Sequence, residues 1–427
     1  MNVHDSERMA EVLRAAGFVD TVAAEDADLV VFNTCSVRER AEQKLRSEVG
    51  KLAPLRRARP ELVIAVAGCV AQQEGEALLR QMPLIDVVIG PDNIPELPGL
   101  VLAHQQGAPP TARTVFDTDA PRFLAAQPQP GSAPVAAYIT TMKGCDERCS
   151  FCVVPYTRGP ERYRPAAEII AEARAQVAAG AREILLLGQT VDSFRDPALP
   201  PPASDDPDES QFPWLLRRIA EEVPGLLRLR YVSPHPRHLT PALVAAHQEL
   251  PVLARHVHLP VQSGSDRMLR RMIRRYTRAE YLERVRRLQA AVPGLTLSSD
   301  IIVGFPGETE EDFAETLSLC EEAGFLSVFG YKYSPRPFTP ALKLRGAVAD
   351  EVMSERLARL FAQVEARGFA HRQSLVGTRQ EVLLEGPSKR GAGQFQGRTD
   401  HNEIVHVVLP EDAADVDLTG ALVLGDD

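Results

Sequence analysis

Residues 144–159 read GCDERCSFCVVPYTRG, and the three cysteines in this stretch are the most informative feature of the chain. Cys145, Cys149 and Cys152 have the spacing C-x3-C-x2-C, which lets one short loop surround a [4Fe-4S] cluster. Closed clusters and structural zinc sites are held by four protein ligands. No fourth ligand follows closely, because the next histidine is His235. The spacing therefore predicts a cluster with one iron open to a small molecule, and an incomplete zinc loop is the alternative.

The spacing resembles that of the radical S-adenosylmethionine (SAM) enzymes. In that superfamily, the amino and carboxylate groups of SAM bind the open iron. The resemblance implies that one electron then cleaves the sulfonium to a 5′-deoxyadenosyl radical. It also implies an electron donor, such as a flavodoxin or a ferredoxin. The protein itself contributes binding, orientation and exclusion of solvent around the cofactor.

Six apolar stretches, separated by helical segments, extend outward from the cysteine motif. Alternation of strands and helices predicts a parallel α/β arrangement, and six such units predict an incomplete (β/α) barrel over residues 135–371. The cysteines follow the first stretch, at the strand end where such barrels carry their chemistry. The predicted strands are residues 135–142, 183–187, 226–232, 255–259, 295–303 and 325–331.

Residues 1–104 show a second alternation of strands and helices, which predicts a separate parallel α/β domain. Cys35 and Cys69 each follow a predicted strand, so we expect both at one edge of that sheet. The first helix has no strand before it. We therefore expect a first strand upstream of Met1, and a start that is mis-assigned or truncated. Residues 105–134 are rich in Pro, Ala, Gln and Gly and predict a linker.

The last part of the chain, residues 372–427, changes to short strand-like segments, which predict a small β-barrel. Its loop 387–398 carries three cations, several glycines and one aromatic residue, a composition that could hold a phosphate backbone and stack on a base. Residues 196–210 contain almost nothing to bury and predict a disordered insertion. The fold class is therefore α/β with a C-terminal β-barrel.

Charge and cysteine usage limit the possible partners and compartment. The net charge of −10 argues mildly against nucleic acid, but ten arginines face only three acidic residues between 255 and 287. This segment predicts contact with an RNA backbone, and a solvated helix face is the alternative. No apolar run approaches the ~20 residues of a membrane span. Clustered cysteines without a leader indicate a reducing, cytoplasmic location, and Cys320 is expected to be an ordinary buried thiol.

Motifs along the whole chain resemble the radical SAM methylthiotransferases, most closely those that act on isopentenyladenosine in tRNA. The resemblance implies removal of hydrogen from C2 of that base at position 37, beside the anticodon. It also implies a monomer that binds the anticodon stem-loop through a C-terminal TRAM-like domain. The motifs are FNTCSVRERAEQK, AGCVAQQEGE, CDERCSFCVVPYTRGPERYRP, LLLGQTVDSF, YVSPHP, HLPVQSGSDRMLRRM, DIIVGFPGETEEDF, YKYSPRPFTPA and EGPSKRGAGQFQGRTDHN.

The family resemblance also implies a second, auxiliary [4Fe-4S] cluster in residues 1–104, which supplies sulfur, while a second SAM supplies the methyl group. Three cysteines hold that cluster in the family, the first within a Tyr-Gly-Cys-Gln-Met-Asn stretch. This sequence opens at Met1-Asn2, directly after the place where that cysteine would stand. Only Cys35 and Cys69 remain as expected ligands of the auxiliary cluster.

Other residues have both a functional and a structural interpretation. Gln189 and Ser263, near strand ends, are candidates for contact with SAM or substrate, or for ordinary hydrogen bonding. Gly304 is a candidate for close approach of the backbone to SAM. Arg158 could bind a carboxylate or phosphate or form a structural ion pair, and His235, between two prolines, could act as an acid–base group or form a rigid turn.

Two alternatives to this function stay open at the level of sequence. The first keeps the chemistry and changes the substrate to threonylcarbamoyl-adenosine in tRNA, or to an aspartate of a ribosomal protein. The second is a tRNA-binding protein that is inactive in sulfur insertion because one auxiliary cysteine is missing. Motifs such as CVVPYTRG and QSGSDRMLRRM favour the isopentenyladenosine substrate.

Overall fold

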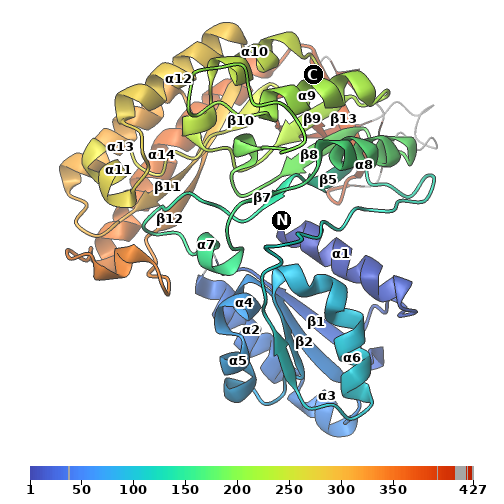
Figure 1. The fold of residues 1–427 in the computed structure, drawn as a ribbon. Coiled ribbons are helices and arrows are strands. Elements are labelled where there is room, and N and C mark those ends of the chain that lie inside the picture. The colour runs from blue at the N-terminus through green and yellow to red at the C-terminus, as the bar shows by residue number, and fades with distance from the viewer. Residues whose placement is uncertain (37–38, 392, 409–419, 421, 426–427) are drawn as a thin grey trace.

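The structure is a computed structural model that describes residues 1–36, 39–391, 393–408, 420 and 422–425. An α/β unit built from the first residues lies below a larger barrel-like unit in Figure 1, with helix α7 (Val154–Thr157) between them. A small antiparallel sheet lies beside the barrel. Among the described residues, no helix is both long and apolar enough to cross a membrane.

The N-terminal unit is a four-stranded parallel sheet in the order β1-β2-β3-β4. All six residues of β2 are buried, because helices cover both faces of a parallel sheet. Within the described residues, β1 pairs on one side only, with β2. The strands are β1 (Leu29–Thr34), β2 (Val63–Gly68), β3 (Val87–Ile89) and β4 (Thr111–Arg113); the helices are α1 (Asn2–Ala15), α2 (Glu39–Lys51), α3 (Ala53–Ala58), α4 (Cys69–Glu74), α5 (Glu76–Gln81) and α6 (Leu97–Gln105).

The prediction that residues 105–134 form only a linker was wrong at β4. Residues Thr111–Arg113 pair in parallel with β3, from Val87↔Thr111 to Ile89↔Arg113. The stretch Thr-Ala-Arg has no apolar periodicity, because it is a short edge strand with partly exposed side chains. β4 is recognised as a strand only through its pairing with β3.

All six predicted barrel strands are present in the central unit, and they form two three-stranded parallel sheets, β5-β8-β9 and β10-β11-β12. A single parallel bridge, Leu229↔Leu253, connects β9 to the segment before β10. The arrangement confirms the incomplete barrel. The strands are β5 (Ala136–Thr140), β8 (Glu183–Leu187), β9 (Arg228–Tyr231), β10 (His256–His258), β11 (Thr296–Val303) and β12 (Ser327–Lys332).

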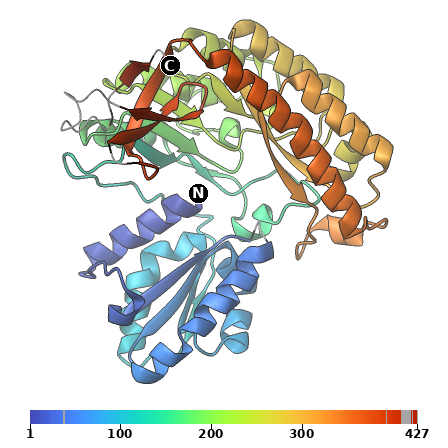
Figure 2. The same ribbon diagram turned by 180° about the vertical axis from the view of Figure 1, so that it is seen from behind.

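Helices cover the outside of these strands, and Figure 2 shows the long helix α14 running along the outer face. One continuous apolar core lies between strands and helices, with Phe212, Tyr281 and Phe325 fully buried. Truncation of such an aromatic residue costs roughly 3–5 kcal/mol, so this core holds the unit together. The helices are α8 (Ala166–Ala178), α9 (Phe212–Glu222), α10 (Pro241–Glu249), α11 (Asp266–Met272), α12 (Arg278–Ala291), α13 (Glu310–Ala323) and α14 (Asp350–Leu375).

The segment 196–210, expected to be disordered, is anchored at both ends. The Asp196 carboxylate accepts the Ala166 N–H at 2.8 Å, at the start of α8. Near the other end, Arg237 Nε donates to the Asp208 carboxylate at 2.6 Å. Hydrogen bonds of polar side chains, rather than apolar packing, fix this segment at both ends. The prediction of disorder from its few hydrophobic residues was therefore wrong.

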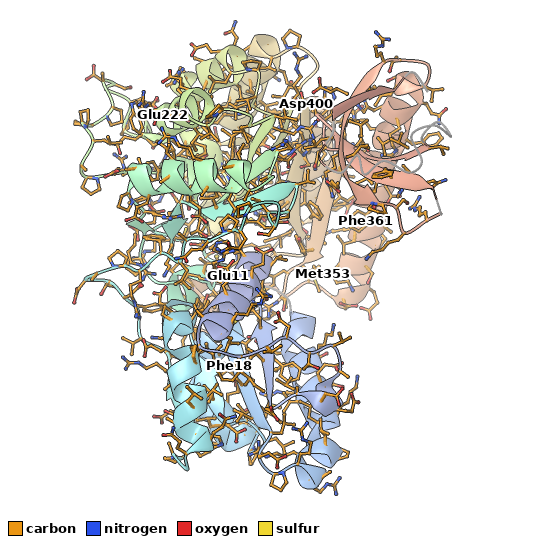
Figure 3. All side chains as sticks on the ribbon, turned by 90° about the vertical axis from the view of Figure 1, so that its right-hand side faces the viewer. Glu11, Phe18, Glu222, Met353, Phe361 and Asp400 are labelled. Carbon is orange, nitrogen blue, oxygen red and sulfur yellow. The ribbon has the colours of Figure 1, made fainter. Side chains whose placement is uncertain are left out.

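The C-terminal unit is an antiparallel sheet in the order β15-β14-β13-β16, as expected for a small β-barrel. Arg228 and Arg230 of β9 donate to the carbonyl oxygens of Arg398 and Thr399 at 3.1 and 3.0 Å. Figure 3 shows the neighbouring Asp400 at this junction. Residues 409–419 of the predicted domain lie outside the described residues. The strands are β13 (Gln380–Pro387), β14 (Gln394–Thr399), β15 (Ile404–Val408) and β16 (Leu422–Gly425).

Asp312, in the first turn of α13, ties this helix to the loop that follows β10. Its carboxylate accepts hydrogen bonds from Ser265 Oγ at 2.7 Å, Arg267 Nε at 3.1 Å and the Thr309 N–H at 2.8 Å. Thr309 and Asp312 also form a capping box. Burial by itself raises the pKa of Asp312, but these donors outweigh burial and lower the pKa to about 2.

The substitution Asp312→Asn is expected to destabilise the central unit by roughly 2 kcal/mol, because hydrogen bonds to a charged group are lost. At this size the melting temperature should fall by about 4–8 °C. The folded-state pKa lies below the unfolded value, so the contribution is complete above about pH 4 and disappears as the pH falls toward 2. Calorimetry between about pH 4 and pH 2 measures the difference in melting temperature between the variant and the wild type. Glu283→Gln, which breaks an exposed pair with Arg287, is the control, and an equal shift in that variant would contradict the assignment.

Candidate metal centre

The cysteine loop leaves the barrel at the end of β5 and is closed at its base by a two-stranded antiparallel ladder, β6 (Met142–Lys143) with β7 (Arg162–Tyr163). Gly144 has a φ of +76°, and a Cβ there would lie 1.9 Å from the Pro160 carbonyl oxygen. The Cys145 N–H donates to the Gly159 carbonyl at 3.1 Å. Glycine is therefore required for the two ends of the loop to meet.

The three cysteines of the loop lie together, with Cys145 and Cys149 buried and Cys152 partly so. Burial, together with the charges of Cys149 and Cys69, raises the pKa of Cys152 to about 12. Burial likewise raises the pKa of Cys145 to about 12. These two thiols stay neutral until a bound cation offsets the thiolate charge, as in metal sites where binding releases protons.

Each of two loop cysteines has a hydrogen-bond partner from another part of the barrel. Thr190 Oγ1 lies 3.2 Å from Cys145 Sγ, and Arg274 donates from Nη1 to Cys149 Sγ at 3.2 Å. No group of three or more metal-ligating side chains is already arranged as a coordination sphere in the described part of the chain. Thr190 and Arg274 therefore each bring a polar group from the barrel to a sulfur of the loop.

Cys35 and Cys69 lie at one edge of the N-terminal sheet, as predicted. Thr34, the last residue of β1, is in register with Gly68, the last residue of β2, and the two cysteines come directly after. A Cβ on Gly68 would lie 2.3 Å from the Thr34 carbonyl oxygen, so glycine allows this approach. Cys69 is buried and Cys35 is partly exposed. Cys69 is also close enough to act on the pKa of Cys152, so the two cysteine groups face each other across the domain junction.

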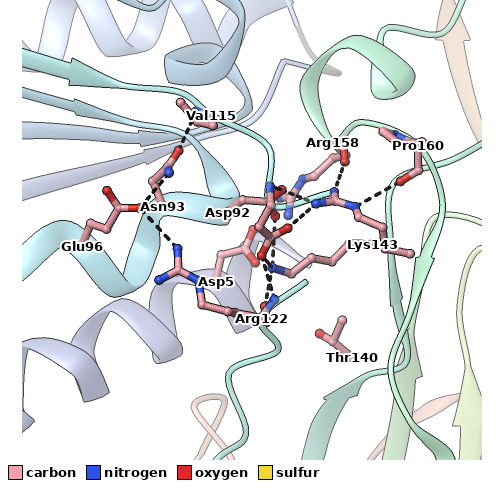
Figure 4. A network of polar contacts seen from close by, with 12 residues as sticks. Asp5, Asp92, Asn93, Glu96, Val115, Arg122, Thr140, Lys143, Arg158 and Pro160 are labelled. Carbon is pink, nitrogen blue, oxygen red and sulfur yellow. Dashed lines mark hydrogen bonds and ion pairs between the residues drawn. The ribbon is translucent and has the colours of Figure 1, made fainter. Parts of the chain in front are cut away.

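Arg158, at the end of α7, connects the cysteine loop to the N-terminal unit (Figure 4). Its Nε donates to Cys69 Sγ at 3.3 Å, and its Nη2 pairs with the carboxylate of Asp5 in α1. All three side chains are buried. Burial disfavours the charge of Arg158, but Asp5 and Cys69 raise its pKa, and Arg158 in turn holds the pKa of Asp5 well below its usual value. The structural ion pair is therefore the interpretation of Arg158 that the structure supports.

A second set of ion pairs reinforces this junction. Arg162, in β7, pairs with the carboxylates of Asp92 and Asp117, which come from the N-terminal unit and the segment after it. Lys143, in β6, lies with its Nζ 3.0 Å from Asp92 Oδ1. Figure 4 shows Lys143 and Asp92 beside Arg158. The two strands that close the cysteine loop are therefore also the strands that hold the N-terminal unit.

Polar residues from two strand ends gather beside Cys145. Asp192, fully buried in the turn after β8, accepts the His235 N–H at 2.8 Å. Burial raises the pKa of Asp192 well above its usual value and lowers that of His235 well below. Among the described residues, Asp192 Oδ2, His235 Nε2 and Gln189 Oε1 have no hydrogen-bond partner.

Thr190 and Asp192 were missed at the level of sequence, although both belong to the stretch LLLGQTVDSF that follows a predicted strand. Their position three to five residues after the strand end was the signal.

Other predicted residues have structural roles. Ser263 is fully buried and lies 3.2 Å from Thr316 Oγ1, which favours the hydrogen-bonding interpretation. Gly304 has a φ of +73°, and a Cβ there would lie 2.2 Å from Met353. This contact supplies a packing reason for the glycine, while its proximity to SAM stays a prediction. Cys320 is 1% exposed, which confirms an ordinary buried thiol.

The RNA-binding expectations for two segments need correction. Most arginines between 255 and 287 do not form an open basic surface, because they are paired or buried. In the loop 387–398, the aromatic residue Phe395 packs in the core of the C-terminal sheet and cannot stack on a base, whereas Lys389 and Arg390 are exposed. The arginines of the first segment that pair with carboxylates are Arg255, Arg267, Arg278, Arg284, Arg286 and Arg287.

Two family models match parts of the chain. Residues 139–320 match the radical SAM superfamily, and residues 1–90 match the uncharacterized protein family UPF0004. The structure is similar to that of the radical SAM methyltransferase TsrM from Kitasatospora setae, with a TM-score of 0.51 and 15% identity. That match covers 90% of this chain and 72% of TsrM, and it supports the fold alone.

Close relatives cover nearly the entire chain. The tRNA-2-methylthio-N6-dimethylallyladenosine synthase of Sorangium cellulosum is 64% identical over 99% of this chain and 88% of its own length. The protein of the same name from Geobacter metallireducens is 45% identical over 99% of this chain and 92% of its own length. The chain therefore belongs to the family of tRNA-2-methylthio-N6-dimethylallyladenosine synthases, which are radical SAM enzymes.

Proposed function

We propose that this protein is a transferase that adds a methylthio group to C2 of N6-isopentenyladenosine at position 37 of tRNA. The observation that carries the proposal is the 64% identity over 99% of the chain to a protein of that activity. The cysteine loop at the end of β5 is in the position where barrels of this class carry their chemistry.

We propose that Cys145, Cys149 and Cys152 hold the radical SAM cluster. Three thiols close together at a strand end, with donors from Thr190 and Arg274, fit a cluster that leaves one iron open. When bound, this cluster and SAM supply the radical chemistry that a C–H bond beyond the reach of any side-chain base requires.

The chain's own residues bind and orient what enters the barrel. The unpartnered atoms of Gln189 and Asp192 can accept hydrogen bonds from the ammonium and hydroxyl groups of SAM or of the nucleoside. His235 accepts the Arg237 N–H at Nδ1, which leaves its proton on Nε2 as a donor. Gln189 and Gly304 remain our candidates for contact with SAM. Burial of the surrounding residues keeps solvent from the reacting atoms.

Cys35 and Cys69 are our candidate ligands of the auxiliary [4Fe-4S] cluster. Their adjacent positions after β1 and β2, and the facing cysteine loop, support a sulfur donor beside the radical site. These two residues supply two of the thiolates that such a cluster needs, so their fit to it is partial.

The domain assignment follows from the same proposal. Residues 1–104 would carry the auxiliary cluster, residues 135–371 the radical SAM chemistry, and residues 372–427 would form the TRAM-like RNA-binding domain. Lys389 and Arg390 are exposed cations through which that domain could contact the phosphate backbone of the anticodon stem-loop. We further propose a cytoplasmic monomer that receives electrons from a flavodoxin or ferredoxin.

Mass spectrometry of tRNA nucleosides from a strain without the encoding gene tests this function. We expect 2-methylthio-N6-isopentenyladenosine to disappear and N6-isopentenyladenosine to accumulate, and a plasmid copy to restore the wild-type pattern. Loss of the methylthio form of threonylcarbamoyl-adenosine, or of a modified ribosomal aspartate, would point to the alternative substrates. An unchanged methylthio pool in every fraction would contradict the proposed activity.

A further inference from the structure

Arg274 is a buried cation that touches the cysteine loop, and its charge has not yet entered the argument. It is 5% exposed, and each nitrogen of its guanidinium donates to a different acceptor. Nε donates to the Tyr276 hydroxyl at 2.9 Å, and Nη2 donates to the Pro260 carbonyl at 2.8 Å. Nη1 donates to Cys149 Sγ at 3.2 Å. The rigid fork of an arginine suits three acceptors in fixed directions.

No carboxylate pairs with Arg274 in the part of the chain that the structure describes. Two of its acceptors are neutral oxygens, and the Tyr276 ring, 5.3 Å away, adds only a modest cation–π attraction. An unpaired charge in a protein interior is strongly unfavourable. As a cluster ligand Cys149 would be a thiolate, so its sulfur would supply an anionic acceptor for this charge.

The backbone holds Arg274 in a fixed position relative to Cys149. The Ser150 N–H donates to the Met272 carbonyl at 2.9 Å, and the Ser150 hydroxyl donates to the Arg271 carbonyl at 2.7 Å. Ser150 directly follows Cys149, so these bonds tie the C-terminal turn of α11 to the cysteine loop. The guanidinium and the sulfur are thus positioned from both sides, and their contact does not depend on a mobile side chain.

We propose that Arg274 is a positioning residue that orients the Cys149 thiolate and raises the reduction potential of the radical SAM cluster. The inference rests on the proposed function, in which Cys149 is a ligand of that cluster. A [4Fe-4S] centre on three thiolates carries net negative charge, and this charge grows by one when an external donor of the flavodoxin or ferredoxin class gives up one electron. A fixed cation and a hydrogen bond at one thiolate stabilise the reduced form more than the oxidised form.

A redox titration of the reconstituted enzyme tests the proposal. In Arg274→Gln, loss of a hydrogen bond between charged groups should lower the ratio of reduced to oxidised cluster about tenfold at a fixed solution potential. This change corresponds to a midpoint about 59 mV lower for a one-electron step. Iron content per chain should remain at the wild-type value. Electron paramagnetic resonance without SAM follows the reduced cluster and does not depend on turnover.

Arg271→Gln is the matched control, because Arg271 lies in the last turn of α11, three residues before Arg274, and donates to the carbonyls of Pro306 and Arg345 without contacting a cysteine. Its midpoint should equal that of the wild type. Equal midpoints for Arg274→Gln and the wild type would overturn the proposal, as would the same shift in the control.

A second variant covers the case in which Arg274→Gln does not retain iron. Lysine keeps the charge but cannot donate to all three acceptors, so Arg274→Lys should lower the midpoint by less than the about 59 mV expected for Arg274→Gln. A wild-type midpoint in Arg274→Lys would then overturn the proposal. Wild-type protein that binds no cluster would instead overturn the assignment of Cys149 as a ligand, so the two failures are distinguishable.

Discussion

Replacement of Cys152 by alanine is expected to remove the radical SAM cluster and with it the cleavage of SAM. Iron in the reconstituted protein should fall by roughly four atoms per chain, the content of one cubane cluster. Cleavage of SAM should fall by more than about 100-fold, the loss that even an outer partner of a metal ligand can cause. The reason is that the loop would keep two thiolates, which cannot hold three irons.

Iron analysis, the optical spectrum and the yield of 5′-deoxyadenosine measure these effects. Cys320→Ala is the matched control, because this thiol lies in α13 and is also buried. The control should keep its iron and its activity. If Cys152→Ala kept a full complement of iron and cleaved SAM, the C-x3-C-x2-C loop would not be the cluster site.

The second large effect is expected at the domain junction. Substitution of Arg158 by glutamine leaves the buried carboxylate of Asp5 without its partner, which costs roughly 3–5 kcal/mol. It also removes the donor to Cys69 Sγ. The N-terminal unit should therefore open more readily from the barrel, while the thiols of the radical loop, which do not contact Arg158, remain in place.

Hydrogen exchange in the α1 peptide, residues 2–15, measures this opening. In a double-mutant cycle, Asp5→Asn combined with Arg158→Gln should destabilise by less than the sum of the single variants, because the removal of either partner already breaks the pair. Arg14→Gln on the same helix, which breaks the exposed pair with Asp20, should change stability by about 1 kcal/mol or less. Unchanged exchange in Arg158→Gln would contradict a structural role for this ion pair.

The arginines between 255 and 287 show that a count of charges within one segment does not reveal whether those charges are paired. Composition indicated a basic segment, yet Arg267 and Arg278 pair with Asp312 and Glu322, which come later in the chain. Their partners lie on the neighbouring helix α13, which sequence distance does not reveal. The aromatic residue Phe395 makes the same point, because alternation of buried and exposed positions within β14 places it in the core.

The amino-acid sequence by itself determined the order of the six barrel strands, the loop that carries the three cysteines and the placement of Cys35 and Cys69 after strands. These features depend on spacing and periodicity within a few residues, and the parallel arrangement then brings strand ends to one edge. Only the tertiary structure decided which arginine meets which sulfur. Arg158 and Cys69 are 89 residues apart, and Arg274 and Cys149 are 125 apart. Such contacts arise from packing between units, where the burial of a charge selects its partner, and no local pattern encodes that choice.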